Sequence, residues 1–251
     1  MIILVILGLL IGVLLGLLGG GGSILAVPAL VYGAGIPLAA AIPTSLIVVG
    51  LSSAIAALPR MRQVQWRLAA IFAGTGAAAA FAGAAVNRHL HPTVVLLGFA
   101  ALMVIAGIRM LRDPGAVGGA CALPAGGINW RSCLPRAIGA GLGVGFLTGL
   151  FGVGGGFLII PALVVLLGLS MPTAVATSLI IITTNSIAGF IAHLGDAPVD
   201  LGLTATFTVA AVAGALAAGR VADRLPGARL RRWFGFLVLA VAAYITVQAL
   251  P

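Results

Sequence analysis

Long runs of apolar residues, separated by short polar connections, fill almost the whole chain. A helix that crosses the hydrocarbon core of a bilayer needs about 20 predominantly apolar residues, and each run is close to that length or longer. The runs occupy residues 2–33, 34–58, 68–86, 93–108, 137–169, 170–192, 201–219 and 233–250. This pattern predicts an all-α, polytopic membrane helix bundle without a separate soluble domain. Residues 1–18 lack the basic start of a secretory signal, so we expect the first run to remain in the mature chain.

The composition agrees with a chain that lies mostly in lipid. Hydrophobic residues make up 62% of it and charged residues 7%, whereas soluble domains carry about 25% charged residues. The net charge of +9 comes from Arg residues in the connections between apolar runs, where the positive-inside bias places them. We therefore expect a multi-pass protein of the cell (plasma or inner) membrane, with the lipid bilayer as a partner and no nucleic-acid partner. The sequence leaves the oligomeric state open, and a homo-oligomer is one of the alternatives.

The sequence offers little for metal or cofactor chemistry. Cys121 and Cys133 are too few for a disulfide framework and show no metal-ligand spacing, so we expect two ordinary thiols. All four carboxylates lie in connections, whereas a cation site inside a membrane needs buried acids. We predict no metal site and no cofactor.

The chain matches itself when it is shifted by 133 residues. Fourteen of the 24 residues in 8–31 are identical to their partners in 141–164. The tetrapeptides that begin at Pro28 and Thr44 recur at Pro161 and Thr177. We therefore predict a duplicated unit. Its parts are a first transmembrane repeat over 1–110, a cytoplasmic linker over 111–136 and a second transmembrane repeat over 137–251.

Equivalent connections of the two repeats carry opposite charge. Connection 59–67 holds three Arg, whereas its counterpart 193–200 holds two Asp and no Arg. The next connection reverses this pattern, with one Arg in 87–92 but five Arg and one Asp in 220–232. Arg-rich connections stay in the cytoplasm, so equivalent connections lie on opposite sides of the membrane. The predicted architecture is a pair of inverted-topology repeats, as in many secondary transporters.

Each repeat holds a run of glycines inside an apolar stretch that is too long for one crossing. Residues 137–169 as a single helix would extend about 50 Å at ~1.5 Å per residue, although the hydrocarbon core is only ~30 Å thick. Glycine is a poor helix former, so we expect breaks at 19–22 and 152–156. Each stretch would then fold back as a re-entrant pair of short helices, with new helices beginning near Ser23 and Phe157.

These glycine breaks predict a site for a small anion. A helix N-terminus presents unpaired N–H groups and about half a positive charge, and glycine lets the backbone approach a ligand closely. Paired glycine breaks at matching places in two repeats also favour a substrate site. The candidate substrate-binding residues are Gly19, Gly20, Gly21, Gly22, Ser23, Thr44, Ser45, Gly152, Gly154, Gly155, Gly156, Thr177, Ser178 and Asn185.

Both kinds of candidate residue also have a structural interpretation. Glycines can simply allow close helix packing, which is what we expect of Gly8, Gly12 and Gly16 and of their copies at Gly141, Gly145 and Gly149. Hydroxyl groups inside membrane helices often bond back to their own helix.

The two glycine motifs resemble those of the TauE/SafE family of sulfite and organosulfonate permeases. The first motif reads GLLGGGGSILAVP over 16–28, and the second reads GLFGVGGGFLIIP over 149–161. The first has Ser23 where the second has Gly156, so the two breaks need not be equivalent. The resemblance covers nearly the whole chain. It implies a plasma-membrane transporter of small, mostly sulfur-containing anions that often acts as an exporter, and it implies no enzymatic activity.

Two other functions remain open from the sequence. A passive anion channel would share the same architecture, and only a carrier would show counterflow. An intramembrane serine hydrolase would use Ser23 or Ser45 as nucleophile and His193 as base, which must lie within hydrogen-bond reach of each other. The predicted topology opposes the hydrolase, because it places His193 at the membrane boundary and Ser23 near mid-depth.

Overall fold

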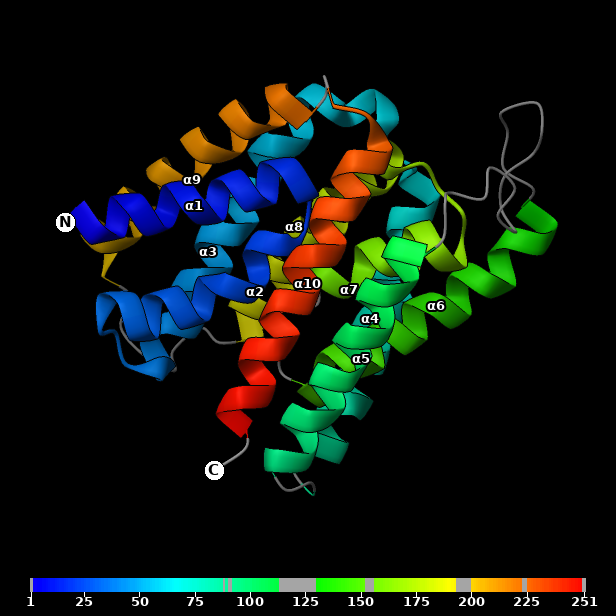
Figure 1. The fold of residues 1–251 in the computed structure, drawn as a ribbon, viewed down its shortest axis with the longest axis horizontal. Coiled ribbons are helices and arrows are strands. Elements are labelled where there is room, and N and C mark those ends of the chain that lie inside the picture. The colour runs from blue at the N-terminus through cyan, green and yellow to red at the C-terminus, as the bar shows by residue number, and fades with distance from the viewer. Residues whose placement is uncertain are drawn as a thin grey trace. The chain divides into compact units, whose positions relative to one another are not determined.

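The computed structural model describes residues 2–87, 89, 92–112, 130–151, 156–192, 200–222 and 225–249. These residues form helices and no strand, as the apolar pattern predicts (Figure 1). The elements in chain order are α1 (Ile2–Leu18), α2 (Gly21–Pro28), η1 (Ala29–Gly33), α3 (Leu38–Ala57), η2 (Leu58–Gln63), α4 (Trp66–Asn87), α5 (Pro92–Arg112), α6 (Trp130–Phe151), α7 (Gly156–Pro161), η3 (Ala162–Leu166), α8 (Met171–Ala192), α9 (Leu201–Ala222) and α10 (Gly227–Ala249).

Three helical segments within the described part of the chain are long and apolar enough to cross a membrane. They are Ala40–Gln63, Met171–Ile191 and Leu201–Ala222, and Ile3–Leu18 forms a shorter apolar helix. Each of the three overlaps one of the apolar runs that the sequence shows.

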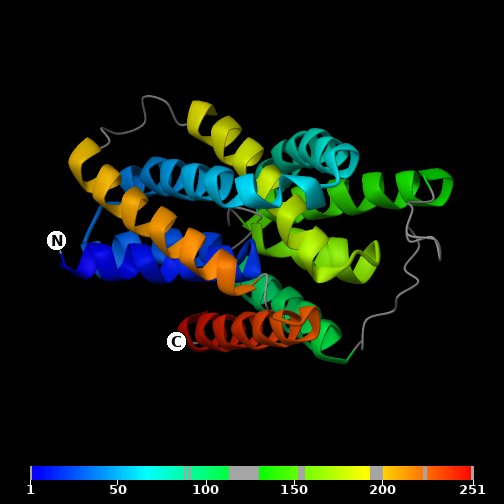
Figure 2. The same cartoon turned by 90° about the horizontal axis from the view of Figure 1, so that it is seen from above.

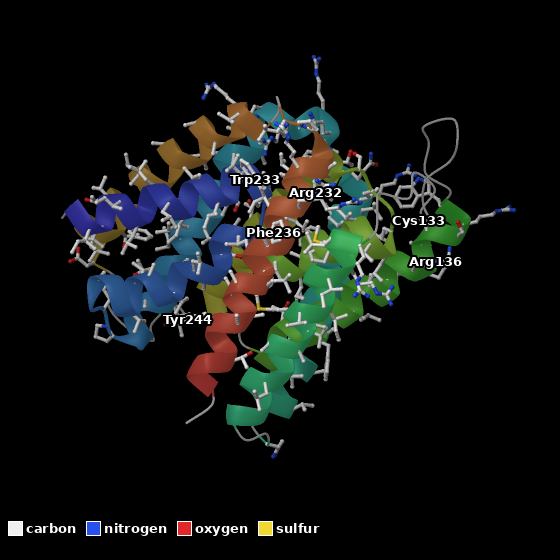
Figure 3. All side chains as sticks on the ribbon, viewed as in Figure 1. Cys133, Arg136, Arg232, Trp233, Phe236 and Tyr244 are labelled. Carbon is white, nitrogen blue, oxygen red and sulfur yellow. The ribbon has the colours of Figure 1, made fainter. Side chains whose placement is uncertain are left out.

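The structure corrects two expectations around the central linker. Helix α6 begins at Trp130 rather than at 137, and it is 22 residues long instead of short. Apolar runs mark only the lipid-buried part of a helix, whereas the hydrogen-bonded backbone extends into the polar boundary. Cys133, which Figure 3 labels on α6, is disulfide-bonded and not a free thiol. The chain's only other cysteine, Cys121, lies outside the described residues.

Local backbone features recur at the offset of 133 residues. η1 and η3 are both π-helical, and they begin at Ala29 and Ala162. Each is followed by a glycine with positive φ, Gly35 at +68° and Gly168 at +71°. In both turns a backbone N–H group donates to the carbonyl oxygen six residues earlier. Ile36 donates to Leu30 at 3.1 Å, and Leu169 donates to Leu163 at 3.0 Å. Left-handed glycines are typical of helix C-termini, so the duplication extends to the way these helices end.

The chain forms two compact units, and each unit combines segments from both repeats. Unit 1 consists of Met1–Ala69 and Val175–Leu225, and unit 2 consists of Ala70–Ala174 and Pro226–Pro251. Unit 1 therefore contains α1, α2, α3 and α9 with most of α8, whereas unit 2 contains α5, α6, α7 and α10 with most of α4.

Helices α1 and α9 pack closely in unit 1 because glycines on α1 remove the side chains between them (Figure 1). A methyl group at Gly12 or Gly16 would overlap the backbone of Ala211 or Ala215. The neighbours advance together along both helices, so α1 and α9 run parallel. The pairs are Gly8 with Ala210, Gly12 with Ala211, and Gly16 with Ala215. The packing role predicted for this glycine stripe is confirmed.

The equivalent pair in unit 2, α6 and α4, packs in the same way. A methyl group at Gly141 would overlap Thr75, and one at Gly145 would overlap Gly76. The repeat relates α6 to α1 and α4 to α9, so one packing arrangement occurs twice with the repeats exchanged. Also in unit 2, α5 lies beside α10 (Figure 2).

Candidate functional site

The first glycine break separates α1 from α2. Helix α1 ends at Leu18, and Gly19 then takes a φ of +67°, which L-residues with a side chain rarely adopt. Gly20 precedes α2 as its N-cap residue, and no side chain caps this helix end. Helix α2 begins at Gly21, two residues before the position that the sequence predicts.

Gly19 is required for a second reason, which is the close approach of α8. A methyl group on Gly19 would lie 2.8 Å from Val175 Cγ1 and 2.9 Å from Ser178 Oγ. The Ser178 hydroxyl shares its single proton between the Gly19 carbonyl oxygen at 3.2 Å and the Val175 carbonyl oxygen at 2.9 Å. The break of the first repeat therefore contacts the Thr-Ser segment of the second repeat, within unit 1.

After the break the chain folds back along α1. A methyl group at Gly22 would lie 2.5 Å from the Ile11 carbonyl oxygen and 3.0 Å from Leu15, and one at Gly33 would meet the side chain of Leu7. The contacts move toward the start of α1 as the chain advances through α2 and η1. Glycine thus serves two roles here, since Gly19 turns the chain and Gly22 lets α2 lie against α1.

The hydroxyl groups near the break form hydrogen bonds with the protein backbone. Ser23 donates to the Gly20 carbonyl oxygen at 2.7 Å. Thr177 is fully buried and accepts from the Gln65 backbone N–H at 3.1 Å. Together with the bond from Ser178 to Gly19, both carbonyl groups of the break receive a hydroxyl hydrogen bond. A serine hydroxyl has a single proton, so Ser23 and Ser178 as placed here do not donate to a ligand.

Thr44 and Ser45 lie far from this break. Their hydroxyls donate back to their own helix, to Ala40 at 2.7 Å and to Ile42 at 2.8 Å. A methyl group at Gly189 would lie 3.3 Å from the Leu46 side chain, which places this part of α3 beside the end of α8. Ser178 lies about 17 Å back along α8 at ~1.5 Å per residue. The two Thr-Ser pairs therefore lie at different levels along α8, and one site closed by all four hydroxyls stays a prediction.

The remaining candidates are only partly described. Gly152, Gly154 and Gly155 lie outside the described residues, so the second break stays a prediction. Helix α6 ends at Phe151 and α7 begins at the buried Gly156, close to the predicted start. Asn185 is half-buried on α8.

Sequence reasoning missed one residue beside the break. Arg60 was counted only as a cytoplasmic charge, but it is 3% exposed in η2. Its Nη1 donates to the Gly16 carbonyl oxygen at 3.0 Å, and its Nη2 donates to the Gly219 carbonyl oxygen at 2.8 Å. The available signal was its place directly after an apolar run, where a long side chain can turn back into the protein.

Comparison with known proteins gives the family of this chain. A family model described as "Sulfite exporter TauE/SafE" matches residues 4–245. The chain is 34% identical over 247 residues to a probable membrane transporter protein of Xylella fastidiosa (strain 9a5c). The alignment covers 95% of this chain and 92% of the Xylella protein. It is also 25% identical over 244 residues to the probable membrane transporter protein YdhB of Bacillus subtilis (strain 168). That alignment covers 94% of this chain and 96% of YdhB. No solved structure matches the chain significantly. The chain therefore belongs to the sulfite exporter TauE/SafE family and is a membrane transporter.

Proposed function

We propose that this chain is a secondary transporter of the plasma membrane that carries a small sulfur-containing anion, such as sulfite or an organosulfonate. The observation that carries the proposal is the first glycine break, where α2 begins without a side-chain cap. The first N–H groups of a helix have no partner within that helix, and they favour negative charge. An anion bound there would accept hydrogen bonds from the backbone of the break.

The hydrogen bonds around the break support this choice of charge. Carbonyl oxygens repel an anion, and those of Gly19 and Gly20 are both engaged by hydroxyl groups. No described helix interior contributes a carboxylate, because the four acidic residues lie in connections. Binding through neutral donors is weaker than a direct ion pair, which suits a transporter that must release its substrate.

The sulfur-containing substrate rests on the family. The matching family model bears the name of a sulfite exporter, whereas the relatives in Xylella and Bacillus are named only as probable membrane transporters. Sulfite and sulfonates are compact oxyanions whose several oxygens can accept backbone N–H groups at the same time.

The proposal includes inverted repeats that cross the bilayer several times. Two pairs of equivalent helices support the inversion because each pair packs antiparallel. Within unit 1, α3 meets α8 at Leu46 with Gly189 and at Gly50 with Ser186. Within unit 2, α5 meets α10 at Gly107 with Leu239, and Leu111 lies beside Gly235. A two-fold axis along the membrane normal would instead make equivalent helices parallel.

Side chains on α10 suit a lipid environment. Trp233, Phe236 and Tyr244 are all at least half exposed and are spaced along this helix (Figure 3). Trp233 follows Arg232, and Tyr244 lies toward the other end. Aromatic residues gather at both membrane–water boundaries, and Arg gathers at the cytoplasmic one. We infer that α10 contacts lipid, with its Arg-rich start on the cytoplasmic side.

Cysteine labelling in whole cells tests the inversion. The native cysteines are first replaced by serine. We expect Ala197→Cys to react with a membrane-impermeant maleimide in intact cells, and Gln63→Cys to react only after the membrane is permeabilised. The reason is the opposite charge of the two equivalent connections. If a membrane-impermeant maleimide labels both positions from the same side, the inverted topology is wrong.

Counterflow in proteoliposomes tests the transport function. Vesicles loaded with unlabelled sulfite should transiently accumulate ³⁵S-sulfite above equilibrium, because a carrier exchanges substrate faster than it leaks. Vesicles without protein serve as the control. Flux without this overshoot would favour a passive anion channel. Absence of flux for both sulfite and methanesulfonate would show that the substrate class is wrong.

A further inference from the structure

A glycine break between two consecutive helices brings opposite electrostatic poles together. The N-terminus of α2 contributes about half a positive charge, but the C-terminus of α1 contributes about half a negative charge at nearly the same point. Only two residues, Gly19 and Gly20, separate these helices. A break of this kind therefore has little net attraction for an anion unless the negative pole of α1 is neutralised.

Arg60 lies where it neutralises that pole. The Gly16 carbonyl oxygen, which accepts from Nη1 at 3.0 Å, belongs to the last turn of α1. The Gly219 carbonyl oxygen, which accepts from Nη2 at 2.8 Å, belongs to the last turn of α9. Arginine stays charged under all physiological conditions. The positively charged guanidinium group thus contacts the negative poles of two helices.

The burial of Arg60 makes this charge effective. Its side chain is 3% exposed, and Coulomb interactions weaken much less in a protein interior than in water. Arg62 on the same 3₁₀ turn is exposed, so solvent and salt screen its charge. The two arginines therefore differ in burial while they share a turn, a charge and the same short connection.

We infer that Arg60 makes the first glycine break selective for anions by cancelling the C-terminal poles of α1 and α9. This inference rests on the proposed anion-transport function and adds the residue that sets the sign of the substrate. Arg60 acts through the helix ends, so it is a positioning and specificity-determining residue rather than a ligand of the anion.

Uptake of ³⁵S-sulfite into proteoliposomes tests the inference with four proteins: the wild type, R60Q, R60K and R62Q. R60Q should raise the half-saturating sulfite concentration about tenfold, since a charge at a helix end interacts more strongly with the helix dipole when it is shielded from solvent. R60K retains the charge and should stay within about threefold of wild type. R62Q should equal wild type, because its charge is exposed. Rates are normalised to inserted protein.

Two competing compounds show whether recognition depends on the charge of the substrate or on its shape. Methanesulfonate is an anion, and methanesulfonamide is a neutral molecule of almost the same size. Methanesulfonate should inhibit sulfite uptake much better than methanesulfonamide in wild type and R60K, and R60Q should reduce this preference about tenfold. A purely structural clamp would lower the maximal rate in R60Q without changing the preference.

The outcomes distinguish the two proposals. If wild type takes up no sulfite, the proposed function fails. If wild type takes up sulfite but R60Q keeps the wild-type affinity and preference, only the role of Arg60 is overturned. A loss of anion preference in R60K would overturn it as well, and this result stays available should R60Q fail to insert.

Discussion

Replacing Gly12 with alanine is expected to lower the free energy of unfolding by about 3 kcal/mol, the upper end of overpacking costs. The added methyl group would overlap the backbone of Ala211 on α9. A backbone cannot rotate away as a side chain can, so α1 and α9 would have to separate. In a membrane the packing of small residues holds helices together, and separation loses contacts along both helices.

The measurement is the melting temperature of the monodisperse protein in detergent. Gly143→Ala on α6 is the matched control, because nothing lies within 4 Å of the added methyl group. In this control the only change is higher helix propensity, which contributes up to about 1 kcal/mol of stability. If Gly12→Ala and Gly143→Ala melted at the same temperature, the close α1–α9 contact would be wrong.

Replacing Gly19 with alanine is expected to lower sulfite transport by about tenfold or more, because displacing a buried hydrogen-bonding group costs about 1–3 kcal/mol. Two effects combine at this position. A left-handed φ costs an alanine about 1–2 kcal/mol, and the methyl group would push the break away from Val175 and Ser178 on α8. The backbone N–H groups that we assign to the anion would then move as well.

Gly35→Ala isolates the first of these effects. Gly35 has almost the same φ as Gly19, but nothing lies within 4 Å of its added methyl group. We expect Gly35→Ala to lower stability and to keep the half-saturating sulfite concentration of wild type. Equal transport defects in the two variants would assign the loss to backbone strain alone, and the first break would no longer be supported as the substrate site.

The sequence predicted features that depend on local chemistry. A run of glycines predicts a helix end whatever surrounds it, and α1 does end at Leu18 beside Gly19. A stripe of glycines likewise predicts close packing, which Gly12 and Gly16 show. The stripe does not identify the helix that packs against it, because any helix with small residues on its surface would fit. That α1 pairs with α9, a helix of the other repeat, required the structure.

The polar residues were harder to predict because their partners are set by tertiary structure. The hydroxyl of Ser178 reaches Gly19 across the sequence, whereas that of Thr44 returns to its own helix. Nothing in the repeated Thr-Ser dipeptide separates these outcomes. Charge counting placed Arg60 on a surface, since an Arg in a short connection is normally solvated. Its burial follows from two helix ends that the fold brings to it.

The pairing of α1 with α9 has a consequence for how the protein is made. Helix α1 leaves the ribosome long before the residues of α9 that cover its glycines, near Ala211 and Ala215, which follow about 200 residues later in the chain. At about 5–20 residues per second, synthesis takes about 10–40 s to reach them. During that time α1 must wait in the membrane or against the insertion machinery, with its close-packing face uncovered. Neither repeat can finish folding before most of the other has been synthesised.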